Sequence, residues 1–389
     1  MAQCALRVLM VVPKYPAPVV GGLERQSREL ATMLVRRGHE VAVASYRFVD
    51  NQRCFEIVDG VQVHRTRALL GKRTVSLAAA FELARMAWRF GRTFDVVHVH
   101  TISWLPTLAV VIAKLLRKPV LVKVPNTGTR GIAVLRRRPL DRIRLALLTC
   151  GDVFVSMNEE IREELKQIGI PATRVLAAPN GIDMRATVAD ARRKDDTVTV
   201  VFVGRLVPEK RPLDLIAAWK LLQGRCPRTA SLRLIGDGPA RSDLERSIER
   251  LGLTESVKLL GQRDDVLQLL GESDVFVLPS TNEGNSNAVL EAMRAGLPVI
   301  ATNLSGTRLQ VGPEGERFLV APGDVEGLAE RIEVLLLDEG LRCEVGRAMR
   351  NRVEAHFSIE EVAATYEAAY HLMVSGRRDQ VSCLNNDRR

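Results

Sequence analysis

The 389-residue sequence predicts two domains, because a single domain typically holds about 100 to 200 residues. Its composition, 46% hydrophobic and 26% charged, is typical of a globular enzyme and excludes disordered, collagen-like and coiled-coil chains, while the 4% aromatic content argues against a nucleic-acid partner. The net charge of +10 comes from the first half, where residues 1–190 contain 29 Lys and Arg against 16 Asp and Glu, so an anionic substrate or membrane surface is favoured.

Short β-branched runs alternate with longer amphipathic segments along the first half of the chain. The predicted helix Leu23–Arg36 places Leu30 and Leu34 on one face and its arginines on the other. The strands expected here are Leu6–Val12, Glu40–Ala44, Val61–His64, Val96–Val99, Val120–Val124, Val153–Ser156 and Val175–Ala177. This alternation predicts βαβ units and a parallel sheet.

The alternation starts again after a charge-dense segment, Ile182–Thr197, which is predicted to be a linker. The strands of this second series are expected at Val198–Val203, Leu232–Ile235, Val257–Leu260, Val275–Leu278 and Val299–Ala301. The predicted fold class is therefore α/β, with two doubly wound, Rossmann-like domains that face one another across a cleft. Ligands of such sheets bind beyond the carboxyl ends of the strands, so functional residues are expected in the loops there.

Neither membrane insertion nor export is expected. The longest uncharged run, Val96–Ala113, contains His98, His100 and Pro106, which a membrane-spanning helix would place in lipid. The N-terminal apolar run contains Arg7 and no small-residue cleavage site, so it is predicted to be a buried strand rather than a signal peptide. The six cysteines are far apart and form no CxxC motif, which predicts neither a zinc site nor a disulfide framework and favours a cytoplasmic location.

Two glycine-containing turns follow predicted strands but carry weak signals. Gly21 and Gly22 open the first helix, where a ligand can approach the main chain, yet the GxGxxG fingerprint of dinucleotide-binding domains is absent. The second turn, Gly236-Asp237-Gly238, precedes a helix that begins near Arg241. Asp237 is predicted to cap that helix, with a ligand contact as the alternative.

The third turn is more specific. A buried strand runs into Gly204, and Arg205 and Lys210 then lie five positions apart on one loop. Arginine offers a planar fork and lysine a point charge, which together suit the two phosphates of a diphosphate. A surface ion pair with Glu209 is the competing interpretation.

The segment from Val275 to Gly306 carries the strongest signal. Its strand ends in a polar loop, and a helix then begins at about Asn287. Glu283 lies on the loop and Glu291 about one turn into the helix, so one carboxylate can face a sugar and the other a nucleoside ribose. The first N–H groups of the helix point into the gap between them, where a diphosphate would sit.

These motifs carry a family resemblance. The run NEGNSNAVLEAMRAGLPVIAT, with FVGRLVPEKRP, APNGID and the N-terminal GG, resembles the motifs of retaining GT-B glycosyltransferases of the glycosyltransferase 4 group, also called group 1. The resemblance runs from Arg7 to about Tyr370 and implies an acceptor-side domain at 1–182, rejoined by a C-terminal helix at about 358–374, a donor-binding domain at 197–357 and a disordered tail at 375–389. It also implies that a hexosyl group moves from a nucleotide-sugar donor to a glycan, lipid-linked or small-molecule acceptor with retained anomeric configuration, in polysaccharide or glycoconjugate biosynthesis.

The resemblance assigns site residues by motif match. It implies that Arg205 and Lys210 hold the donor diphosphate, Glu291 the ribose, and Glu283 the donor sugar or the transition state, with Gly22 near the donor phosphate or the acceptor. The other donor-binding residues that it implies are Gly204, Gly284, Asn285, Ser286 and Asn287.

One departure concerns the acceptor side. Many family members end the strand that matches Val120–Val124 with a histidine that approaches the reacting sugar, and this chain has none there. Asn126 or Lys123 can supply a polar contact instead, or His98 or His100 from the adjacent strand. We expect His100 and Asn126 as acceptor-side residues, with a satisfied core histidine as the competing interpretation of His100.

The expected chemistry is electrostatic stabilisation of a leaving diphosphate. The sequence contains no DxD motif, and Arg205 and Lys210 occupy the role of a metal ion, so neither a metal nor another cofactor is expected. Glu283 is the sole obvious carboxylate on the sugar side, whereas a retaining glycosidase uses two that lie about 5 Å apart, so same-face attack is favoured over a covalent intermediate. A nucleotide-sugar epimerase or hydrolase of the same fold is the alternative function.

Residues 130–148 interleave six arginines, among them Arg136, Arg137 and Arg138, with apolar side chains. This pattern favours a segment that lies on an anionic leaflet, and an ordinary amphipathic helix packed on the first sheet is the competing interpretation. Pro139 divides the segment into a basic loop and a helix. The hypothesis is an anionic or lipid-linked acceptor and an enzyme that binds reversibly to the cytoplasmic face of the membrane.

Overall fold

The computed structural model describes residues 4–15, 21–49, 51–69, 81–82, 85–86, 88–89, 92–127, 131–136, 138–185, 197–225 and 229–388. The chain forms two compact units: unit 1 comprises Met1–Asp183 and Ile359–Arg389, and unit 2 comprises Met184–Ser358. The chain thus leaves unit 1 one residue after the predicted end of the first domain at 182. Most of the predicted linker, residues 186–196, lies outside the described residues.

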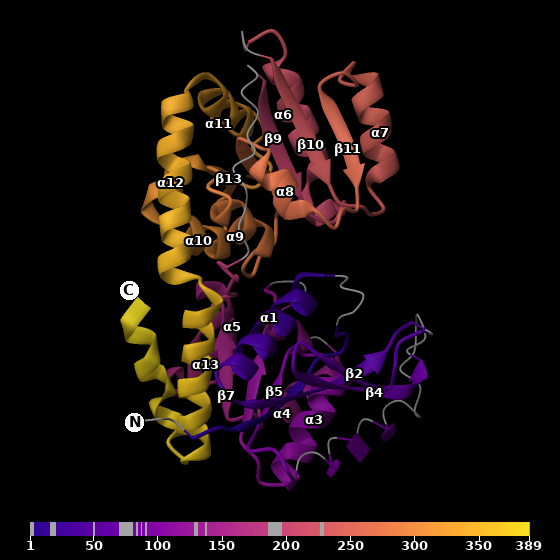
Figure 1. The fold of residues 1–389 in the computed structure, drawn as a ribbon, viewed down its shortest axis with the longest axis vertical. Coiled ribbons are helices and arrows are strands. Elements are labelled where there is room, and N and C mark those ends of the chain that lie inside the picture. Colours follow the sequence, from indigo (N-terminus) through magenta and orange to yellow (C-terminus); the bar gives the residue numbers. More distant parts are fainter. Residues whose placement is uncertain are drawn as a thin grey trace. The chain divides into compact units, whose positions relative to one another are not determined.

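Unit 1 is built on a sheet with the strand order β3-β4-β2-β1-β5-β6-β7-β8 (Figure 1). Neighbouring strands are parallel, except that β3 and β4 form an antiparallel hairpin. The strands are β1 (Arg7–Val11), β2 (Glu40–Arg47), β3 (Phe55–Val58), β4 (Val61–Leu69), β5 (Val96–Val99), β6 (Val120–Lys123), β7 (Val153–Ser156) and β8 (Val175–Ala177).

The sequence analysis predicts each of these strands except β3. The sequence signal for the hairpin that contains β3 is the pair Asp59-Gly60, which is typical of a two-residue hairpin turn. In the structure both residues have the positive φ angles, 51° and 82°, that such a turn requires. The hairpin is the one antiparallel element of an otherwise parallel sheet, and it lies at the sheet edge.

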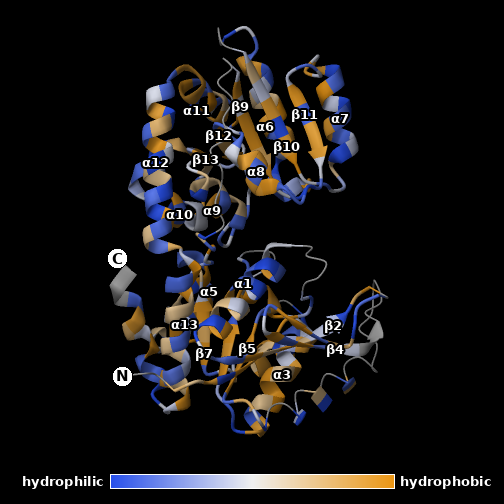
Figure 2. Cartoon of the chain, viewed as in Figure 1, coloured by the Kyte–Doolittle hydropathy of each residue, from blue (hydrophilic) through white to orange (hydrophobic). Residues whose placement is uncertain are grey.

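Helices cover both faces of the unit 1 sheet. One face packs against α1 (Gly22–Arg36) and α13 (Ile359–Val374), which together bury a core that includes Leu30, Leu34 and Tyr366. The opposite face packs against α3 (Trp104–Leu115), η2 (Ile132–Arg136), α4 (Pro139–Leu148) and α5 (Glu159–Gln167), with η3 (Ala172–Arg174) leading into β8. Burial on two faces explains why the central strands are continuous valine-rich runs, which appear as orange arrows in Figure 2.

The prediction of a disordered C-terminal tail is wrong for the part of the tail that the structure describes. Residues Arg378–Arg388 form a 3₁₀ helix, η6, and Val381 within it is fully buried. The Asn385 side chain donates to the Val175 carbonyl (2.9 Å) and accepts from the Ala177 N–H (2.7 Å). The tail therefore covers β8, which is the edge strand of the sheet.

Unit 2 contains a parallel sheet with the order β11-β10-β9-β12-β13-β14. The strands are β9 (Val198–Val203), β10 (Ala230–Ile235), β11 (Val257–Gly261), β12 (Val275–Leu278), β13 (Val299–Thr302) and β14 (Leu319–Val320), of which β14 is absent from the predicted set. The helices are η4 (Pro208–Lys210), α6 (Pro212–Leu222), α7 (Arg241–Arg250), α8 (Val266–Gly271), α9 (Asn287–Arg294), α10 (Ser305–Gly315), η5 (Glu316–Phe318), α11 (Val325–Leu337) and α12 (Glu339–His356).

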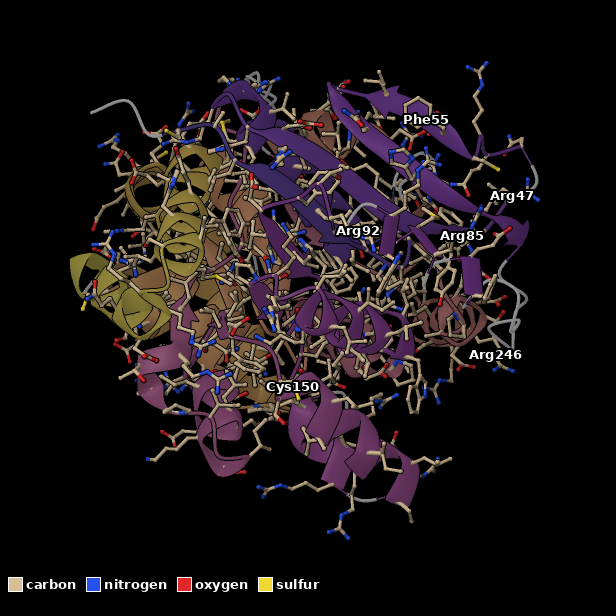
Figure 3. All side chains as sticks on the ribbon, turned by 90° about the horizontal axis from the view of Figure 1, so that it is seen from below. Arg47, Phe55, Arg85, Arg92, Cys150 and Arg246 are labelled. Atoms are coloured by element: carbon tan, nitrogen blue, oxygen red, sulfur yellow. The ribbon has the colours of Figure 1, made fainter. Side chains whose placement is uncertain are left out.

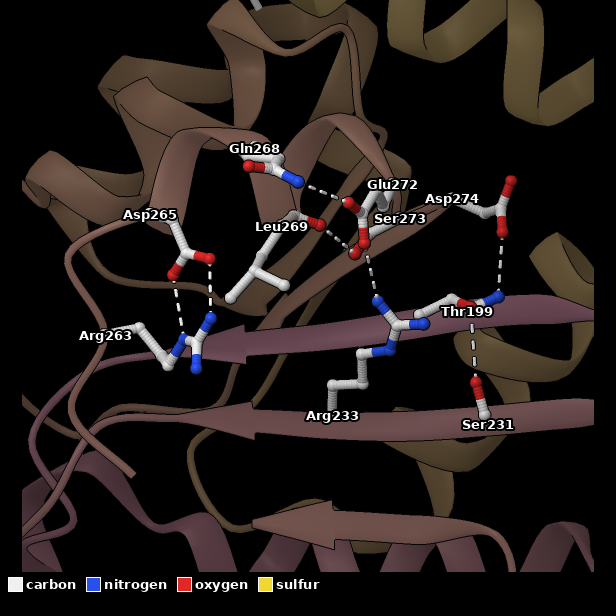
Figure 4. Close-up of polar contacts among 10 residues, drawn as sticks. All are labelled: Thr199, Ser231, Arg233, Arg263, Asp265, Gln268, Leu269, Glu272, Ser273 and Asp274. Atoms are coloured by element: carbon white, nitrogen blue, oxygen red, sulfur yellow. Dashed lines mark hydrogen bonds and ion pairs between the residues drawn. The ribbon is translucent and has the colours of Figure 1, made fainter. Parts of the chain in front are cut away.

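An aspartate before a valine sets the start of three parallel strands. Each of these carboxylates accepts the N–H of a residue on the neighbouring strand, while the N–H of the aspartate donates to the carbonyl of that same residue at 2.8 Å. The pairs are Asp95 with Arg7 (2.9 Å), Asp152 with Val120 (2.9 Å) and Asp274 with Thr199 (2.7 Å). Figure 4 shows the third, beside the Arg233–Glu272 and Arg263–Asp265 contacts. These bonds fix β12 against β9 at their amino ends, and so fix where their carboxyl ends lie.

Candidate active site

Two loops meet at the carboxyl ends of β9 and β12, which are neighbours at the centre of the unit 2 sheet. Strands follow one another outward in opposite directions from this pair, so it is the topological switch point at which such sheets bind ligands. The loop after β12 is tied to the loop after β9, because the N–H and the hydroxyl of Thr281 both donate to the Glu209 carbonyl, at 2.8 and 3.2 Å. The two strongest sequence motifs therefore form one site.

The turn at Gly236–Gly238 packs directly against the backbone of the loop after β9. A Cβ atom on Gly236 would lie 1.9 Å from the Gly204 carbonyl oxygen, and one on Gly238 would lie 2.4 Å from that of Leu206. Only glycine allows this approach. The prediction that Asp237 caps the next helix is wrong: α7 has no side-chain cap, and the Asp237 carboxylate accepts from the Gly238 N–H at 2.8 Å.

Lys210 and Glu283, each predicted as a site residue on its own loop, form an ion pair. The Lys210 ammonium reaches across to the loop after β12 and donates to the Glu283 carboxylate, a contact that the competing interpretation of a surface ion pair with Glu209 does not expect. The Glu283 side chain is only 8% exposed, while that of Lys210 is 21% exposed. Arg205 is exposed and, within the described part of the chain, its guanidinium has no hydrogen-bond or ion-pair partner.

The helix that follows lies as the spacing predicts. α9 begins at Asn287, so Glu283 lies on the loop before it and Glu291 lies about one turn inside it, with 5% of its surface exposed. Gly284 and Asn285 are also buried. Ser286 is the N-cap residue in an extended conformation, without a side-chain cap, so the first N–H groups of α9 are directed toward the loop.

Two residues that the sequence analysis does not single out shape this loop. The buried Gln310 side chain accepts from the Ser286 N–H (3.1 Å) and donates to the Ser286 carbonyl (2.8 Å), which fixes the start of α9. A Cβ atom on Gly306 would lie 2.4 Å from the Gly284 carbonyl oxygen, so only glycine fits beneath the loop. A buried glutamine on a following helix has no sequence signal, whereas the glycine stands at the end of the segment already identified.

In unit 1, three residues near the ends of β5 and β6 form a buried polar cluster with α13. His98 Nδ1 lies 2.7 Å from the Tyr370 hydroxyl, and the His98 and His100 rings stack with centroids 3.9 Å apart. The Lys123 ammonium donates to the Asn180 side-chain oxygen at 2.9 Å. These placements favour the core interpretation of His100, which is 1% exposed, over a contact with acceptor.

Burial determines the protonation of this cluster. Desolvation lowers the pKa of His98 and His100 well below 6.5, and Lys123 adds to this because its positive charge opposes theirs. The pKa of Lys123 falls from 10.5 to about 8 for the same reason.

The other predicted unit 1 residues lie at the surface side of the fold. Asn126 is partly exposed, three residues beyond β6. Gly22 is the first residue of α1, behind an extended Gly21. Among the described residues, no group of three or more His, Cys, Asp or Glu side chains is arranged to hold a metal ion. No helix in the described ranges is long and apolar enough to cross a membrane.

The sequence matches the models of two families, Glycosyl transferases group 1 over residues 183–352 and Glycosyltransferase Family 4 over residues 20–186. It is 29% identical to glycogen synthase of Mycobacterium tuberculosis, across 96% of each chain, and 25% identical to N-acetyl-alpha-D-glucosaminyl L-malate synthase of Bacillus anthracis, across 91% of this chain and 94% of that one. Among solved structures, Anabaena HepE in complex with UDP and glucose is similar with a TM-score of 0.75 at 20% identity, covering 94% of this chain and 99% of that one. The fold, two parallel-sheet Rossmann-like units, is GT-B, and the chain belongs to the group 1 glycosyltransferases.

Proposed function

We propose that this glycosyltransferase takes its sugar from a nucleotide-sugar donor bound by unit 2, retains the anomeric configuration and needs no metal ion. The observation that carries the proposal is the pair of loops at the ends of β9 and β12, which brings Lys210 to Glu283 beside the start of α9. A diphosphate leaving group gains negative charge as the anomeric bond breaks. The unpartnered guanidinium of Arg205, the Lys210 ammonium and the first N–H groups of α9 are the groups that would stabilise it.

Lys210 has a second role in this scheme, because its ion pair holds Glu283 in place. A lysine between a carboxylate and a phosphate can balance both charges, so Glu283 stays oriented toward the sugar when the donor binds. Glu291 is proposed to bind the ribose. Gly22 and the partly exposed Asn126 are the unit 1 candidates for contact with the acceptor.

The donor panel for the first test starts from UDP-sugars, since HepE binds UDP and glucose. Activity on a glycan or lipid-linked acceptor is measured with each donor, and ¹H NMR of the product reads its anomeric configuration. Retention supports the proposal, and inversion contradicts it. Loss of nucleotide-sugar in the absence of any acceptor would favour the epimerase or hydrolase alternative.

Excess EDTA tests the metal-free step directly. Because two cations already face the proposed diphosphate position, initial rates should be unchanged by the chelator. Abolished activity that Mg²⁺ or Mn²⁺ restores would contradict this part of the proposal and leave the donor site intact.

We further propose that unit 1 docks on an anionic, cytoplasmic membrane face through α4. Leu140 and Ile143 on this helix are 68% and 55% exposed, and Arg138 and Arg142 beside them are exposed. Basic and apolar side chains together favour an anionic interface.

Part of the segment serves the core instead, as the competing interpretation holds. Ile132 and Leu135 in η2 are buried, and Arg136 donates to the Gln167 carbonyl. Arg130 and Arg137 lie outside the described residues. The membrane proposal therefore rests on α4 alone.

Co-sedimentation with vesicles tests this docking. Binding to anionic vesicles should weaken with salt and in an Arg138→Gln/Arg142→Gln variant, whereas the charge-matched Arg246→Gln/Arg250→Gln variant in unit 2 should bind as the wild type does. Equal binding to anionic and neutral vesicles at low salt would favour a soluble acceptor.

A further inference from the structure

A pocket in unit 1 lies beside the β3–β4 hairpin, and none of its lining residues belongs to the loops of the proposed donor site. Its volume is about 150 Å³, equal to roughly five water molecules, so it has room for one phosphate-sized group. The lining residues are Cys54, His64 and Arg65 from the hairpin side, and Glu82, Arg85, Met86 and Arg89 from the described residues between β4 and β5.

Positive charge predominates in this pocket. Three arginines line it against one glutamate. Arg65 is already compensated, because its guanidinium donates to the Arg53 carbonyl (3.1 Å) and to the Glu56 carboxylate (2.5 Å). The charge that an incoming ligand can meet therefore belongs to Arg85 and Arg89.

Among the described residues that line the pocket, Glu82 is the one acidic side chain beside these two arginines. Both are exposed, and within the described ranges neither guanidinium has a hydrogen-bond or ion-pair partner. Both guanidinium groups line the same pocket, where their like charges repel. An anion between them would remove this repulsion.

His64 supplies a neutral donor at the opposite wall. Burial and the positive charge of Arg89 lower its pKa below 6.5, so the imidazole carries one N–H at neutral pH. The Phe55 ring packs on this imidazole with centroids 4.8 Å apart, which holds its orientation. Figure 3 shows Phe55 and Arg85 on this side of the molecule.

We propose that this pocket binds a phosphate-type oxyanion between Arg85, Arg89 and His64. Guanidinium forks match the oxygen geometry of phosphate and bind it through paired hydrogen bonds, and the positive excess of unit 1 raises the local concentration of anions. In the proposed reaction the natural source is a phosphate carried by the acceptor. That assignment rests on the proposed function, whereas oxyanion binding itself does not.

The test uses the full chain with inorganic phosphate as the probe. Because the proposed donor site also attracts phosphate, binding is measured in an Arg205→Gln/Lys210→Gln background by calorimetry and by hydrogen exchange. We expect phosphate to protect peptides that cover 54–65 and 81–92. Adding Arg85→Gln/Arg89→Gln should weaken binding by about 10-fold or more, as the loss of charged hydrogen bonds predicts.

Arg92→Gln is the matched control, because it removes the same charge from the same segment outside the pocket, where Arg92 lies over the Trp88 ring at 5.2 Å. Its affinity for phosphate should stay within about 2-fold of the background value, since no phosphate hydrogen bond is lost. Protection confined to unit 2 peptides, or equal affinity with and without Arg85 and Arg89, would overturn the proposal. Neither result depends on activity, so failure here is separable from failure of the proposed function.

A second arm identifies the source of the phosphate. Flotation compares phosphatidic acid vesicles with phosphatidylcholine vesicles, with the α4 arginines intact. If the Arg85→Gln/Arg89→Gln change weakens flotation with phosphatidic acid, the oxyanion is a lipid headgroup. If it weakens only the binding of inorganic phosphate, the oxyanion belongs to a soluble acceptor.

Discussion

The two units arrange polar side chains differently around the same kind of sheet. Each has a switch point beside a central strand, between β1 and β5 in unit 1 and between β9 and β12 in unit 2. In unit 2 the two cations that follow β9, Arg205 and Lys210, lie in the connection between β9 and α6. In unit 1 His98, His100 and Lys123 lie inside the core under α13. Topology therefore brings polar groups to the strand ends, and the covering helix decides whether they face solvent or stabilise the core.

This contrast predicts opposite responses to substitution. Unit 2 variants at the two cations should lose activity and keep most of their stability, since Arg205 is exposed and Lys210 is partly exposed. Unit 1 variants should change stability as a function of pH, since their charges are buried.

Lys210→Ala should have the largest effect. We expect turnover to fall by about 100-fold or more, because the ammonium meets a charge that develops in the transition state, and the melting temperature to stay within a few degrees. Steady-state kinetics with a matched melting curve measure both. Lys258→Ala, an exposed lysine on β11, is the control, and unchanged turnover in Lys210→Ala would remove Lys210 from the site.

Glu291→Ala comes next. Its nucleotide affinity should fall by about 1 to 3 kcal/mol, the value of a lost charged hydrogen bond, with a smaller effect on turnover. Calorimetry with the nucleotide product measures this, and Glu249→Ala on exposed α7 serves as the control. Glu291→Gln removes the charge but keeps the size of the side chain. Undiminished nucleotide affinity in both variants would contradict the proposal that Glu291 binds the ribose.

Lys123→Met sharpens the comparison from the unit 1 side. Because the pKa of Lys123 is about 8 when folded and 10.5 when unfolded, the unfolded chain binds more protons between these values, and stability contributed by this group rises with pH. From pH 8 to 9.5 the wild type should gain about 1.5 kcal/mol relative to Lys123→Met. Urea unfolding at the two pH values measures the difference, and parallel pH profiles for the two proteins would contradict it.

The two histidines act at the other end of the pH range. Their pKa values lie well below 6.5 in the folded chain, so the unfolded chain takes up more protons in acid and stability falls below about pH 6.5. This loss belongs to unit 1 and should appear in hydrogen exchange of β5 before any peptide of unit 2 responds.

Asn385→Ala should have the smallest effect. Its side chain forms hydrogen bonds with two backbone groups of the edge strand β8. Loss of these two hydrogen bonds should lower the free energy of unfolding by about 1 kcal/mol. Gln380→Ala, an exposed position on the same element, is the control. Equal melting curves for the two variants would contradict a stabilising contact between the tail and β8, and would favour the disordered tail that the family resemblance implies.

The local pattern of the chain predicted most of both sheets. Valine-rich runs marked the strands because each is buried on two faces, and the positions of Glu283 and Glu291 relative to α9 followed from spacing alone. Strand β3 was missed because its side chains are exposed or only half-buried, so it lacks the continuous buried run that marks the central strands. Strand β14 was missed because it has only two residues. The sequence contains Asp-Val pairs at the starts of β5, β7 and β12. Their role in aligning the strands could not be predicted, because each aspartate bonds to a neighbouring strand whose identity the sequence does not show.

The sequence by itself determined which segments are strands and helices, the division into two units, and which loops carry cations and carboxylates. These are properties of residue type and spacing within one segment. The tertiary structure decided which side chains meet: Lys210 with Glu283, Gln310 with Ser286, Lys123 with Asn180, and Asn385 with β8. Such pairs join residues that are 24 to 210 positions apart, and the order of strands and the helices that cover them, rather than any local pattern, bring them within hydrogen-bond distance.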